Sequence, residues 1–420
     1  MSAVRPQTPL ESSAPKPRTS VLAPFRSRDY RLLWSGLIIS NLGTWMQLTT
    51  LGYLVVKLAG SAKLASLDVG ILGASSAVPV MLFSPLAGVI ADRYPRRQVL
   101  FVTNGLEVCF ALALAILTST HRIALWEIFM IAGLRSTGQS FDAPARQSWV
   151  PLLVPRENLG NAIGLNSVAF NAPSIVGPPV AGVLILSVGI ATSFYVNAVA
   201  TLAVVVALVF MRPVAPSSSV RENVLASILA GVRFLWNDRV LRSVLLLLVV
   251  TALLVRPYSQ LMPAYAAHVV HVDARGLGLL LAASGSGAII GSIATAVLGT
   301  HRRGSVWFAS AMLLATGTIV LGSVHVFAIS FVVLVFIGFA VMSFAGNSNV
   351  LLQTLSPDDM RGRAISVFSM IILGLVPAGS LLLGTVASFV GLPASLIAGG
   401  VLALIISAVV WMGNPQLRTV

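Results

Sequence analysis

The stretch Gly88-Val-Ile-Ala-Asp92-Arg93-Tyr94-Pro95-Arg96-Arg97 joins two long apolar segments of the chain, at 67–91 and 98–118. Four of its ten residues are charged, and an ionised side chain at the bilayer centre costs about 2.5–3.5 kcal/mol on insertion scales. The charged run therefore predicts a short loop at a membrane surface. Asp92 is its only acid, beside three arginines, which indicates that this carboxylate has a specific partner.

The composition is that of a membrane protein. Of the 420 residues, 56% are hydrophobic and only 10% are charged, whereas an ordinary soluble domain is about a quarter charged. A bilayer crossing takes about 20 apolar residues. Twelve such segments can be placed, which predicts an all-α membrane protein with twelve transmembrane helices at 31–56, 67–91, 98–118, 123–142, 159–188, 190–211, 240–267, 274–299, 304–322, 325–350, 363–388 and 391–413.

The basic residues are distributed very unevenly between the two sides of these segments. The side that carries the N-terminus holds 21 of them and the opposite side holds 4, while Arg135 and Arg256 fall inside the membrane segments. Because cytoplasmic loops are rich in Lys and Arg, both termini are expected in the cytoplasm. The net charge of +14 is thus attributed to topology and to anionic lipid, and no nucleic-acid partner is expected.

The polar stretches divide the chain into regions. Residues 1–30 are polar and rich in Pro and Ser, which predicts a disordered cytoplasmic tail, and residues 414–420 form a second cytoplasmic tail. Between the halves 31–212 and 240–413 lies a polar linker, 213–239. An interfacial helix is expected within the linker because apolar residues recur there at helical spacing: Val224, Leu225, Ile228, Leu229 and Val232.

An internal repeat relates the two halves. At an offset of 202 residues, Pro155 matches Pro357 and Gly160 matches Gly362. The register continues through matching Ser and Gly residues, so segment 5 corresponds to segment 11. The repeat predicts two pseudo-symmetric halves of six helices each, with the substrate site near the bilayer midplane between them.

Several motifs resemble those of the major facilitator superfamily. The opening run is similar to its loop signature, Gly-x-x-x-Asp-Arg/Lys-x-Gly-Arg-Arg/Lys, although Pro95 stands at the usual second Gly. The end of segment 4, with Pro-Ala-Arg146-Gln, and the run Arg361-Gly362-Arg363 resemble the branch of the enterobactin exporter and macrolide efflux proteins. The resemblance implies secondary transport and a conformational loop made of Gly88, Asp92, Arg93, Arg96, Arg97 and Asp142. In it we expect Asp92 to bind the N-terminal end of segment 11, and Arg96 or Arg97 to pair with Asp142.

Segment 5 contains Gly177-Pro178-Pro179-Val-Ala-Gly182, which is similar to an exporter signature of the same superfamily. The two prolines remove backbone donors and bend a helix. Gly177 and Gly182 let a neighbouring helix approach closely. The motif favours export, with a generic proline kink as the alternative.

Charges inside the membrane are the candidates for proton coupling. Glu107 follows Arg97 by ten residues, which places it about 15 Å deep at the helical rise. It is the preferred proton carrier, with Arg135 as its expected partner. Glu127 is a further candidate, although its position near a segment end favours simple solvation. The alternative for Glu107 is a structural ion pair that only fastens helices together.

Polar and aromatic residues in segments 1, 7 and 10 suit an amphipathic ligand in a central cavity. The candidates are Asn41, Trp45, Gln47, Arg256, Tyr258, Gln260 and Asn347. For Arg256, an anion-attracting cavity residue and a structural anchor are equally supported. Hydrogen bonding between helices is the alternative for each of the others.

The sequence gives little support to an enzyme. It contains no Walker A run, no Gly-x-Ser-x-Gly and no His-Glu-x-x-His, and its single cysteine excludes an intramolecular disulfide. No cofactor or metal is expected. The main prediction is a monomeric, proton-coupled exporter of an amphipathic small molecule, such as a drug or siderophore, in the bacterial cytoplasmic membrane. A proton symporter for uptake and a non-transporting membrane sensor or scaffold are the alternatives, and sodium coupling stays open.

Overall fold

The computed structural model describes residues 20–211, 224–297 and 303–418, without the side chains of 84–93, 148, 224–228 and 418. Every regular element in these residues is a helix. The first group is α1 (Arg28–Leu58), α2 (Ala62–Arg93), α3 (Arg96–Ser119), α4 (Leu125–Leu153), α5 (Leu159–Asn171), α6 (Pro173–Ser187) and α7 (Ile190–Phe210). After α8 (Val224–Asn237), the second group is α9 (Arg239–Leu254), α10 (Tyr258–His268), α11 (Ala274–Val297), α12 (Arg303–Ser323), α13 (Phe327–Leu355), α14 (Asp358–Met370), α15 (Val376–Val390) and α16 (Leu392–Gly413).

The helices agree with the predicted spans. Among the described residues, 10 helical segments are long and apolar enough to cross a membrane. The other two predicted spans, 31–56 and 123–142, coincide with α1 and α4, which have 31 and 29 residues. Polar side chains such as Gln47 and Arg135 lower the hydropathy of these two helices. These two least apolar spans thus owe part of their polarity to candidate site residues.

Three of the spans are discontinuous, each beside a proline. Segment 5 is divided into α5 and α6 at Ala172, just before Pro173. Segment 7 is divided into α9 and α10 between Val255 and Pro257. Segment 11 contains a π-helix, Ile371–Leu375, between α14 and α15. Proline lacks an N–H group and clashes with the preceding turn, so each break frees backbone carbonyls inside the bundle.

The predicted N-terminal tail extends too far along the chain. A 3₁₀ helix covers Ala23–Arg26, and α1 already begins at Arg28, capped by the hydroxyl of Ser27. The ring of Phe25 packs on Tyr30 and Trp34, with centroids 5.7 and 5.0 Å away. These apolar contacts order residues that a polar composition alone assigns to a tail.

The linker contains a helix, as expected. Helix α8 lies against α14 and α9, with Leu235 buried. Leu229, which was expected on the apolar face, is 69% exposed. Val224, Leu225 and Ile228 lie outside the described side chains. Contact of this helix with a lipid surface stays a prediction, as do the predicted bounds of the halves and linker.

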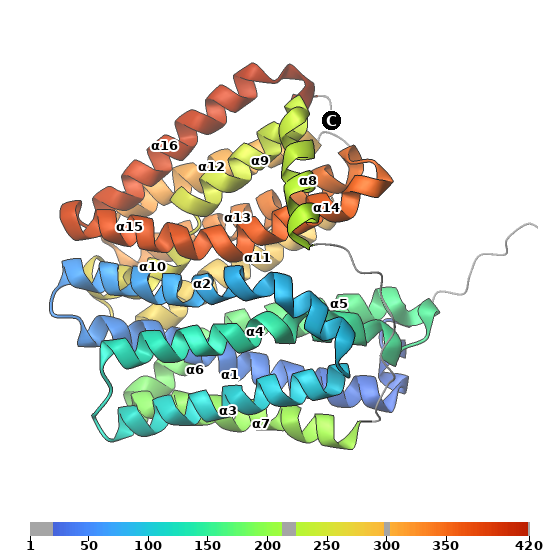
Figure 1. Ribbon diagram of the computed structural model, residues 1–420. Helices are drawn as coiled ribbons and strands as arrows, with labels where there is room; N and C mark the ends of the chain where they lie inside the picture. The colour runs from blue at the N-terminus through green and yellow to red at the C-terminus, as the bar shows by residue number, and fades with distance from the viewer. Residues whose placement is uncertain (1–19, 212–223, 298–302, 419–420) are drawn as a thin grey trace, which may run out of the picture.

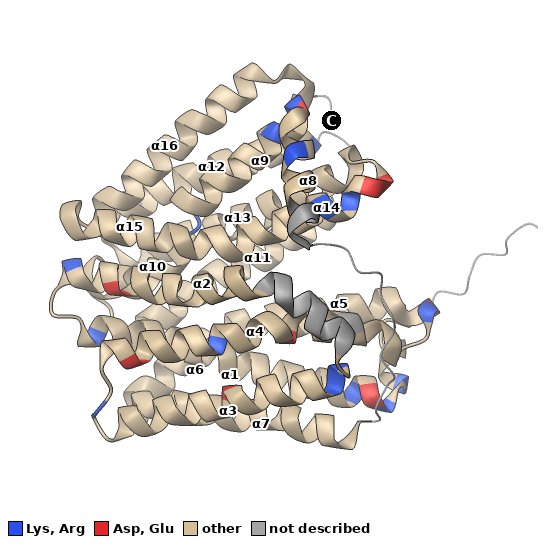
Figure 2. Cartoon of the chain, in the orientation of Figure 1, with Lys and Arg blue, Asp and Glu red and all other residues tan. Residues whose placement is uncertain are grey.

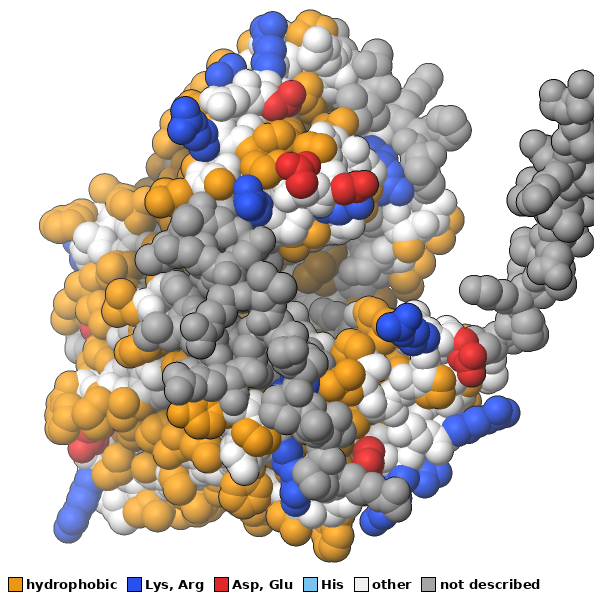
Figure 3. Space-filling view, turned by 45° about the vertical axis from the view of Figure 1, so that its right-hand side comes forward, with side chains coloured by type: hydrophobic (Ala, Val, Ile, Leu, Met, Phe, Trp, Pro, Cys, Tyr) orange, Lys and Arg blue, Asp and Glu red, His pale blue; other side chains and the backbone are white. Residues whose placement is uncertain are grey.

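The helices associate in the same pattern within each half. In the first half α1 and α3 lie beside α7, and α2 lies beside α4; in the second half α12 lies beside α13 and α16, and α11 beside α13. The two halves touch mainly along α2 with α15 and α6 with α11. They converge at one end of the bundle and splay apart at the end that carries the C-terminus (Figure 1). The hollow between the splayed halves is visible in Figure 3.

Candidate functional site

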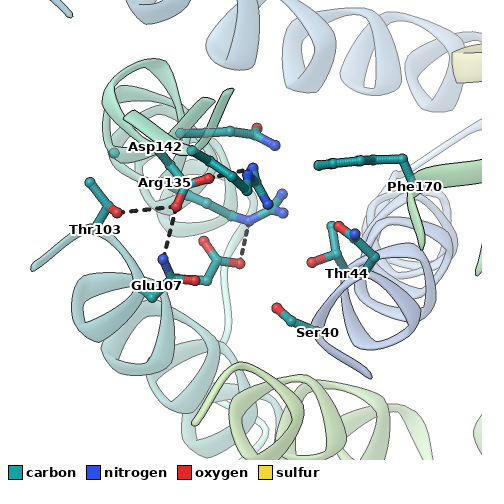
Figure 4. A pocket seen from close by; sticks show the side chains of 12 residues that line it. Ser40, Thr44, Thr103, Glu107, Arg135, Asp142 and Phe170 are labelled. Carbon is teal, nitrogen blue, oxygen red and sulfur yellow. Dashed lines mark hydrogen bonds and ion pairs between the residues drawn. The ribbon is translucent and has the colours of Figure 1, made fainter. Parts of the chain in front are cut away.

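A polar cavity of about 70 Å³ lies within the first half. Helices α1, α3, α4 and α5 line it through Ser40, Asn41, Thr44, Thr103, Asn104, Glu107, Arg135, Gly138, Gln139, Asp142, Arg146 and Phe170 (Figure 4). Four charged groups thus face one small space inside an otherwise apolar bundle. Such clustering of ionisable side chains in a membrane protein marks a functional-site candidate.

Glu107 and Arg135 form an ion pair at this cavity. The guanidinium Nε of Arg135 on α4 donates to Oε1 of Glu107 on α3 at 2.6 Å (Figure 4). The two side chains are 9% and 17% exposed. The partner expected for Glu107 is therefore in contact with it. The pair has one edge on the cavity and the other in the protein interior.

The ion pair continues into a buried amide network that sequence reasoning missed. Asn197 on α7 donates to Oε1 of Gln47 on α1 at 2.6 Å and to Oε1 of Glu107 at 3.5 Å. The hydroxyl of Thr201 donates to Oδ1 of Asn197 at 3.5 Å. Asn197 and Thr201 stand one turn apart in an apolar helix, which is the sequence signal that could have found them. Through this network the charge of Glu107 reaches α1 and α7.

Asp142 is bound by its own helix and by α3. It pairs with Arg146 one turn further along α4, and it accepts hydrogen bonds from Asn104 at 2.8 Å and from Thr103 at 3.3 Å. The guanidinium of Arg146 also lies 4.8 Å from the ring centre of Phe170. A pair four residues apart on one helix forms without any change in the packing of other helices.

Arg97 is not paired with Asp142 in this conformation, so the prediction that Arg96 or Arg97 pairs with Asp142 in the outward-facing form stays a prediction. Arg97 donates instead to the carbonyl groups of Leu208 and Val209, at 2.6 and 2.9 Å. These carbonyls belong to the last turn of α7, whose carbonyl groups are not all bonded within the helix. The helix dipole also favours a cation at this end. Arg96 is buried, with 7% of its surface exposed. The side chains of Gly88, Asp92 and Arg93 lie outside the described residues.

Glu127 lies outside the hydrogen-bond network of Glu107 and Arg135. Its carboxylate accepts the backbone N–H of Ala124 at 2.9 Å and so caps the first turn of α4. It is absent from the residues that line the cavity of Glu107. The structure gives Glu127 a local structural contact, whereas Glu107 and Arg135 are brought together from two helices.

A second cavity, of about 180 Å³, lies between the halves. Trp45 of α1 and Ser174 of α6 line it from the first half, and Arg256, Tyr258 and Ser284 from the second. The hydroxyl groups of Tyr258 and Ser284 are hydrogen-bonded at 2.8 Å. The break between α9 and α10 places Arg256 in the wall of this cavity. Three predicted cavity residues, Trp45, Arg256 and Tyr258, therefore line one cavity, and their contact with substrate stays a prediction.

The other predicted cavity residues have different surroundings. Asn41 lines the first cavity and donates to the carbonyl of Ala169 at 3.0 Å. Gln47 is fully buried in the amide network. Asn347 donates to the Ser343 carbonyl of its own helix at 2.8 Å, and Gln260 lines neither cavity. This bond of Asn347 lies within one helix and is not the bond between helices that the alternative predicted. Gln260 lies close to Gly73 of α2 at the contact between the halves.

The motif of segment 5 forms a contact surface on both of its sides. A Cβ at Gly177 would lie 2.7 Å from that of Trp45 on α1, and one at Gly182 would collide with the Ala274 carbonyl oxygen of α11. Gly278 of α11 approaches the Pro178 carbonyl equally closely, at 2.5 Å for an added Cβ. Pro178 and Pro179 lie inside α6, and the interruption of the span precedes Pro173. The motif thus brings the two halves together.

The comparisons with known proteins now identify the family. The family model described as transmembrane secretion effector matches residues 19–419. The chain belongs to this family of the major facilitator superfamily. The chain is similar to the multidrug efflux pump Tap of Mycolicibacterium fortuitum, with 27% identity over 92% of this chain and 96% of that protein. It is also similar to the enterobactin exporter EntS of Citrobacter koseri, with 29% identity over 74% of this chain and 70% of that one.

Solved structures agree on the fold. A bacterial homologue of the human lysosomal transporter Spinster superposes with a TM-score of 0.71, covering 93% of this chain and 98% of that one at 15% identity. The predicted all-α major facilitator fold is therefore confirmed. As a member of this superfamily, the chain is a multi-pass membrane transporter of small molecules and not an enzyme. Among the described residues, no group of three or more His, Cys, Asp or Glu side chains is placed to hold a metal ion.

Proposed function

We propose that this transporter is a proton-coupled exporter of an amphipathic small molecule across the bacterial cytoplasmic membrane. The observation that carries the proposal is the ion pair of Glu107 with Arg135 at the edge of a cavity. A proton-driven cycle needs a group that gains and loses a proton as access alternates between the two sides. Glu107 is such a group, and its contacts to α4 and α7 connect its charge to the packing of three helices.

The coupling follows from the charge balance of the pair. While Glu107 is ionised, its attraction for Arg135 holds α3 and α4 together. Protonation of Glu107 removes that attraction and leaves Arg135 with an incompletely balanced charge, so it favours a different arrangement of the helices. The substrate then enters the hollow from the cytoplasmic end, and the proton enters from the other end. The protein binds them in alternation and moves them in opposite directions.

The direction is supported by orientation and by the relatives. Most described Lys and Arg residues lie at the end of the bundle where the halves splay apart (Figure 2), which favours a cytoplasmic position for that end. Tap is named a multidrug efflux pump and EntS an enterobactin exporter. Both names favour export, and a drug-like or siderophore-like molecule fits a cavity with aromatic, amide and hydroxyl groups.

Everted membrane vesicles that contain the protein test this proposal. With their lumen acidified, they are expected to accumulate a labelled macrolide or enterobactin, because protons leaving the lumen drive substrate inward. A protonophore is expected to abolish the accumulation. If whole cells take the compound up under the same gradient, and everted vesicles do not, the protein is an uptake symporter instead.

A further inference from the structure

Among the described residues, Arg256 in the membrane interior of the second half has no carboxylate within ion-pair distance. Between Arg239 and Arg418 the sequence has only three acids: Asp273, Asp358 and Asp359. Asp273 accepts the N–H groups of Arg275 and Gly276 at the start of α11. Asp358 and Asp359 occupy the first turn of α14. All three lie at helix ends, whereas Arg256 lies at the break in the middle of segment 7.

Two buried acids of the first half already have arginine partners, and Asp68 of α2, which is in no ion pair among the described residues, does not line the cavity of Arg256. Glu107 is paired with Arg135, and Asp142 with Arg146. The described side chains form three ion pairs within 4.0 Å, the third being Asp358 with Arg361 at the surface, and Arg256 is in none of them. Nor does its guanidinium donate a hydrogen bond to any described residue. An unbalanced charge at this depth is expensive, so its retention points to a ligand that supplies the anion.

The surroundings of Arg256 form a site for an amphipathic ligand. The cavity wall carries hydroxyl groups from Tyr258, Ser259 and Ser284 beside the guanidinium. Apolar surface faces them from Trp45 of the first half and from Leu281 and Met342 of the second. A planar guanidinium binds carboxylate or phosphate through two parallel hydrogen bonds. The aromatic and aliphatic wall suits a ring system attached to that group.

We infer that Arg256 binds an anionic group, a carboxylate or phosphate, of the transported molecule, whose apolar part lies against Trp45. This inference rests on the proposed export function and specifies its substrate class. The bound substrate balances the charge of Arg256, and the cavity between the halves is its binding site. The Glu107–Arg135 pair lies in a separate cavity of the first half, so substrate anion and proton bind at different places.

Three probes with one ring system test the charge preference: 2-naphthoate, 2-naphthylmethanol and 2-naphthylmethylamine. Their affinities are measured by calorimetry on the full-length protein in a neutral detergent. A hydrogen bond to a charged group contributes about 1.5–3 kcal/mol, which corresponds to roughly tenfold to hundredfold in affinity. We expect 2-naphthoate to bind more tightly than the other two by that factor. Equal affinities, or no binding of 2-naphthoate, would show the inference to be wrong.

Substitution of the arginine separates a ligand site from a structural anchor. Arg256→Gln is expected to abolish the preference for 2-naphthoate while leaving the affinity for the alcohol unchanged. Arg275→Gln is the matched control, since it removes the same charge from an exposed position of the same half. Without ligand, Arg256→Gln is expected to raise the melting temperature, because an unbalanced, half-buried cation is removed from the interior of the bundle. A lower melting temperature, or a failure of Arg256→Gln alone to fold, would identify Arg256 as an anchor.

The source of the anion is distinguished in nanodiscs. Phosphatidylglycerol in a phosphatidylcholine bilayer, and inorganic phosphate in the buffer, are each tested as competitors of 2-naphthoate. We expect neither to compete, since neither places an aromatic ring against Trp45. Competition by phosphatidylglycerol would assign the site to a lipid headgroup, and competition by inorganic phosphate would show that the anion binds without the apolar part; either result would overturn the assignment to an amphipathic substrate. If the charge preference is absent while vesicles still export, only the anion site is wrong. If the preference is present and everted vesicles with an acidified lumen do not accumulate labelled 2-naphthoate, the proposed function is wrong.

Discussion

The carboxylate of Glu107 contacts side chains from two other helices, Arg135 on α4 and Asn197 on α7. Asn197 passes the contact on to Gln47 of α1. Protonation of Glu107 would therefore act directly on its contacts with α4 and α7, and α1 is connected to them through the bond between Asn197 and Gln47. Asp142 connects fewer helices, since the arginine that pairs with it is on its own helix.

At this scale we expect Glu107→Gln to uncouple transport. Glutamine keeps the size and hydrogen-bonding capacity of the protonated side chain but releases no proton. Loss of one partner of a buried ion pair disfavours the conformation that holds it by up to about 3–5 kcal/mol. In proteoliposomes the variant should keep counterflow exchange of labelled substrate and lose accumulation driven by a pH gradient.

Glu127→Gln is the matched control for this experiment. It makes the same chemical change at an acid that caps α4, so it should retain gradient-driven accumulation. Wild-type accumulation by Glu107→Gln would mean that the Glu107–Arg135 pair is structural, and the coupling ion would have to bind elsewhere.

Helix α6 packs on a helix of each half. It packs on α1 through Gly177 and on α11 through Gly182, where the Ala274 carbonyl leaves no room for a side chain. The contact of α2 with α15 has the same character, because a Cβ at Gly384 would collide with the Ser66 carbonyl. Close backbone approach of this kind is typical of packing with small residues in membranes. It closes the bundle only at the end away from the C-terminus.

A larger residue at Gly182 should therefore open that end. Gly182→Leu places atoms where the backbone of α11 lies, and overpacking costs about 1–3 kcal/mol. The population of the conformer described here, relative to the one open at the opposite end, should fall by roughly fivefold to hundredfold. In a Cys109→Ser background, a cysteine introduced at Ser292, in the second cavity between the halves, reports the shift. Its reaction with an impermeant thiol reagent from the side of the termini should slow.

The control for this prediction is Gly160→Leu in the same span. A Cβ at Gly160 meets no atom within 4 Å, and the residue is exposed. Its labelling rate should equal that of the parent. An unchanged rate in Gly182→Leu would show that the contact of α6 with α11 does not limit opening.

At the scale of the whole molecule, the distribution of basic residues and the shape of the bundle indicate the same direction for the membrane normal. The end at which the halves splay apart is also the end with most of the described basic residues (Figure 2). The closed end carries three short connections of the first half, which contain few charges. They join α1 to α2, α3 to α4 and α6 to α7. A membrane normal along this axis leaves the apolar flanks of the bundle facing lipid.

We expect the splayed end to face the cytoplasm. In a Cys109→Ser background, Ser61→Cys lies in the exposed connection between α1 and α2, and Asp359→Cys lies in the exposed first turn of α14. An impermeant maleimide should label Ser61→Cys in intact cells and Asp359→Cys only in everted vesicles. The reverse pattern would contradict the topology and the proposed direction of export.

Features that depend on local sequence were predicted well. Hydropathy is a property of consecutive residues, so the spans, the all-α class and the superfamily motifs could be inferred from the chain alone. The offset of Pro155 with Pro357 likewise revealed the correspondence of segments 5 and 11. The pairing of Glu107 with Arg135 was also within reach, because few acids and bases lie inside the membrane segments.

Only the tertiary structure decided which groups meet across helices. Asp142 binds Arg146, Thr103 and Asn104 while Arg97 binds carbonyls at the end of α7, and Asn347 turns to its own helix. A side chain's partner depends on how helices rotate about their axes and pack, and the spacing of residues along one helix does not fix that rotation. The same reason applies to Arg256: the sequence places it in the membrane, but the packing leaves its charge at a cavity with no carboxylate within 4.0 Å among the described residues.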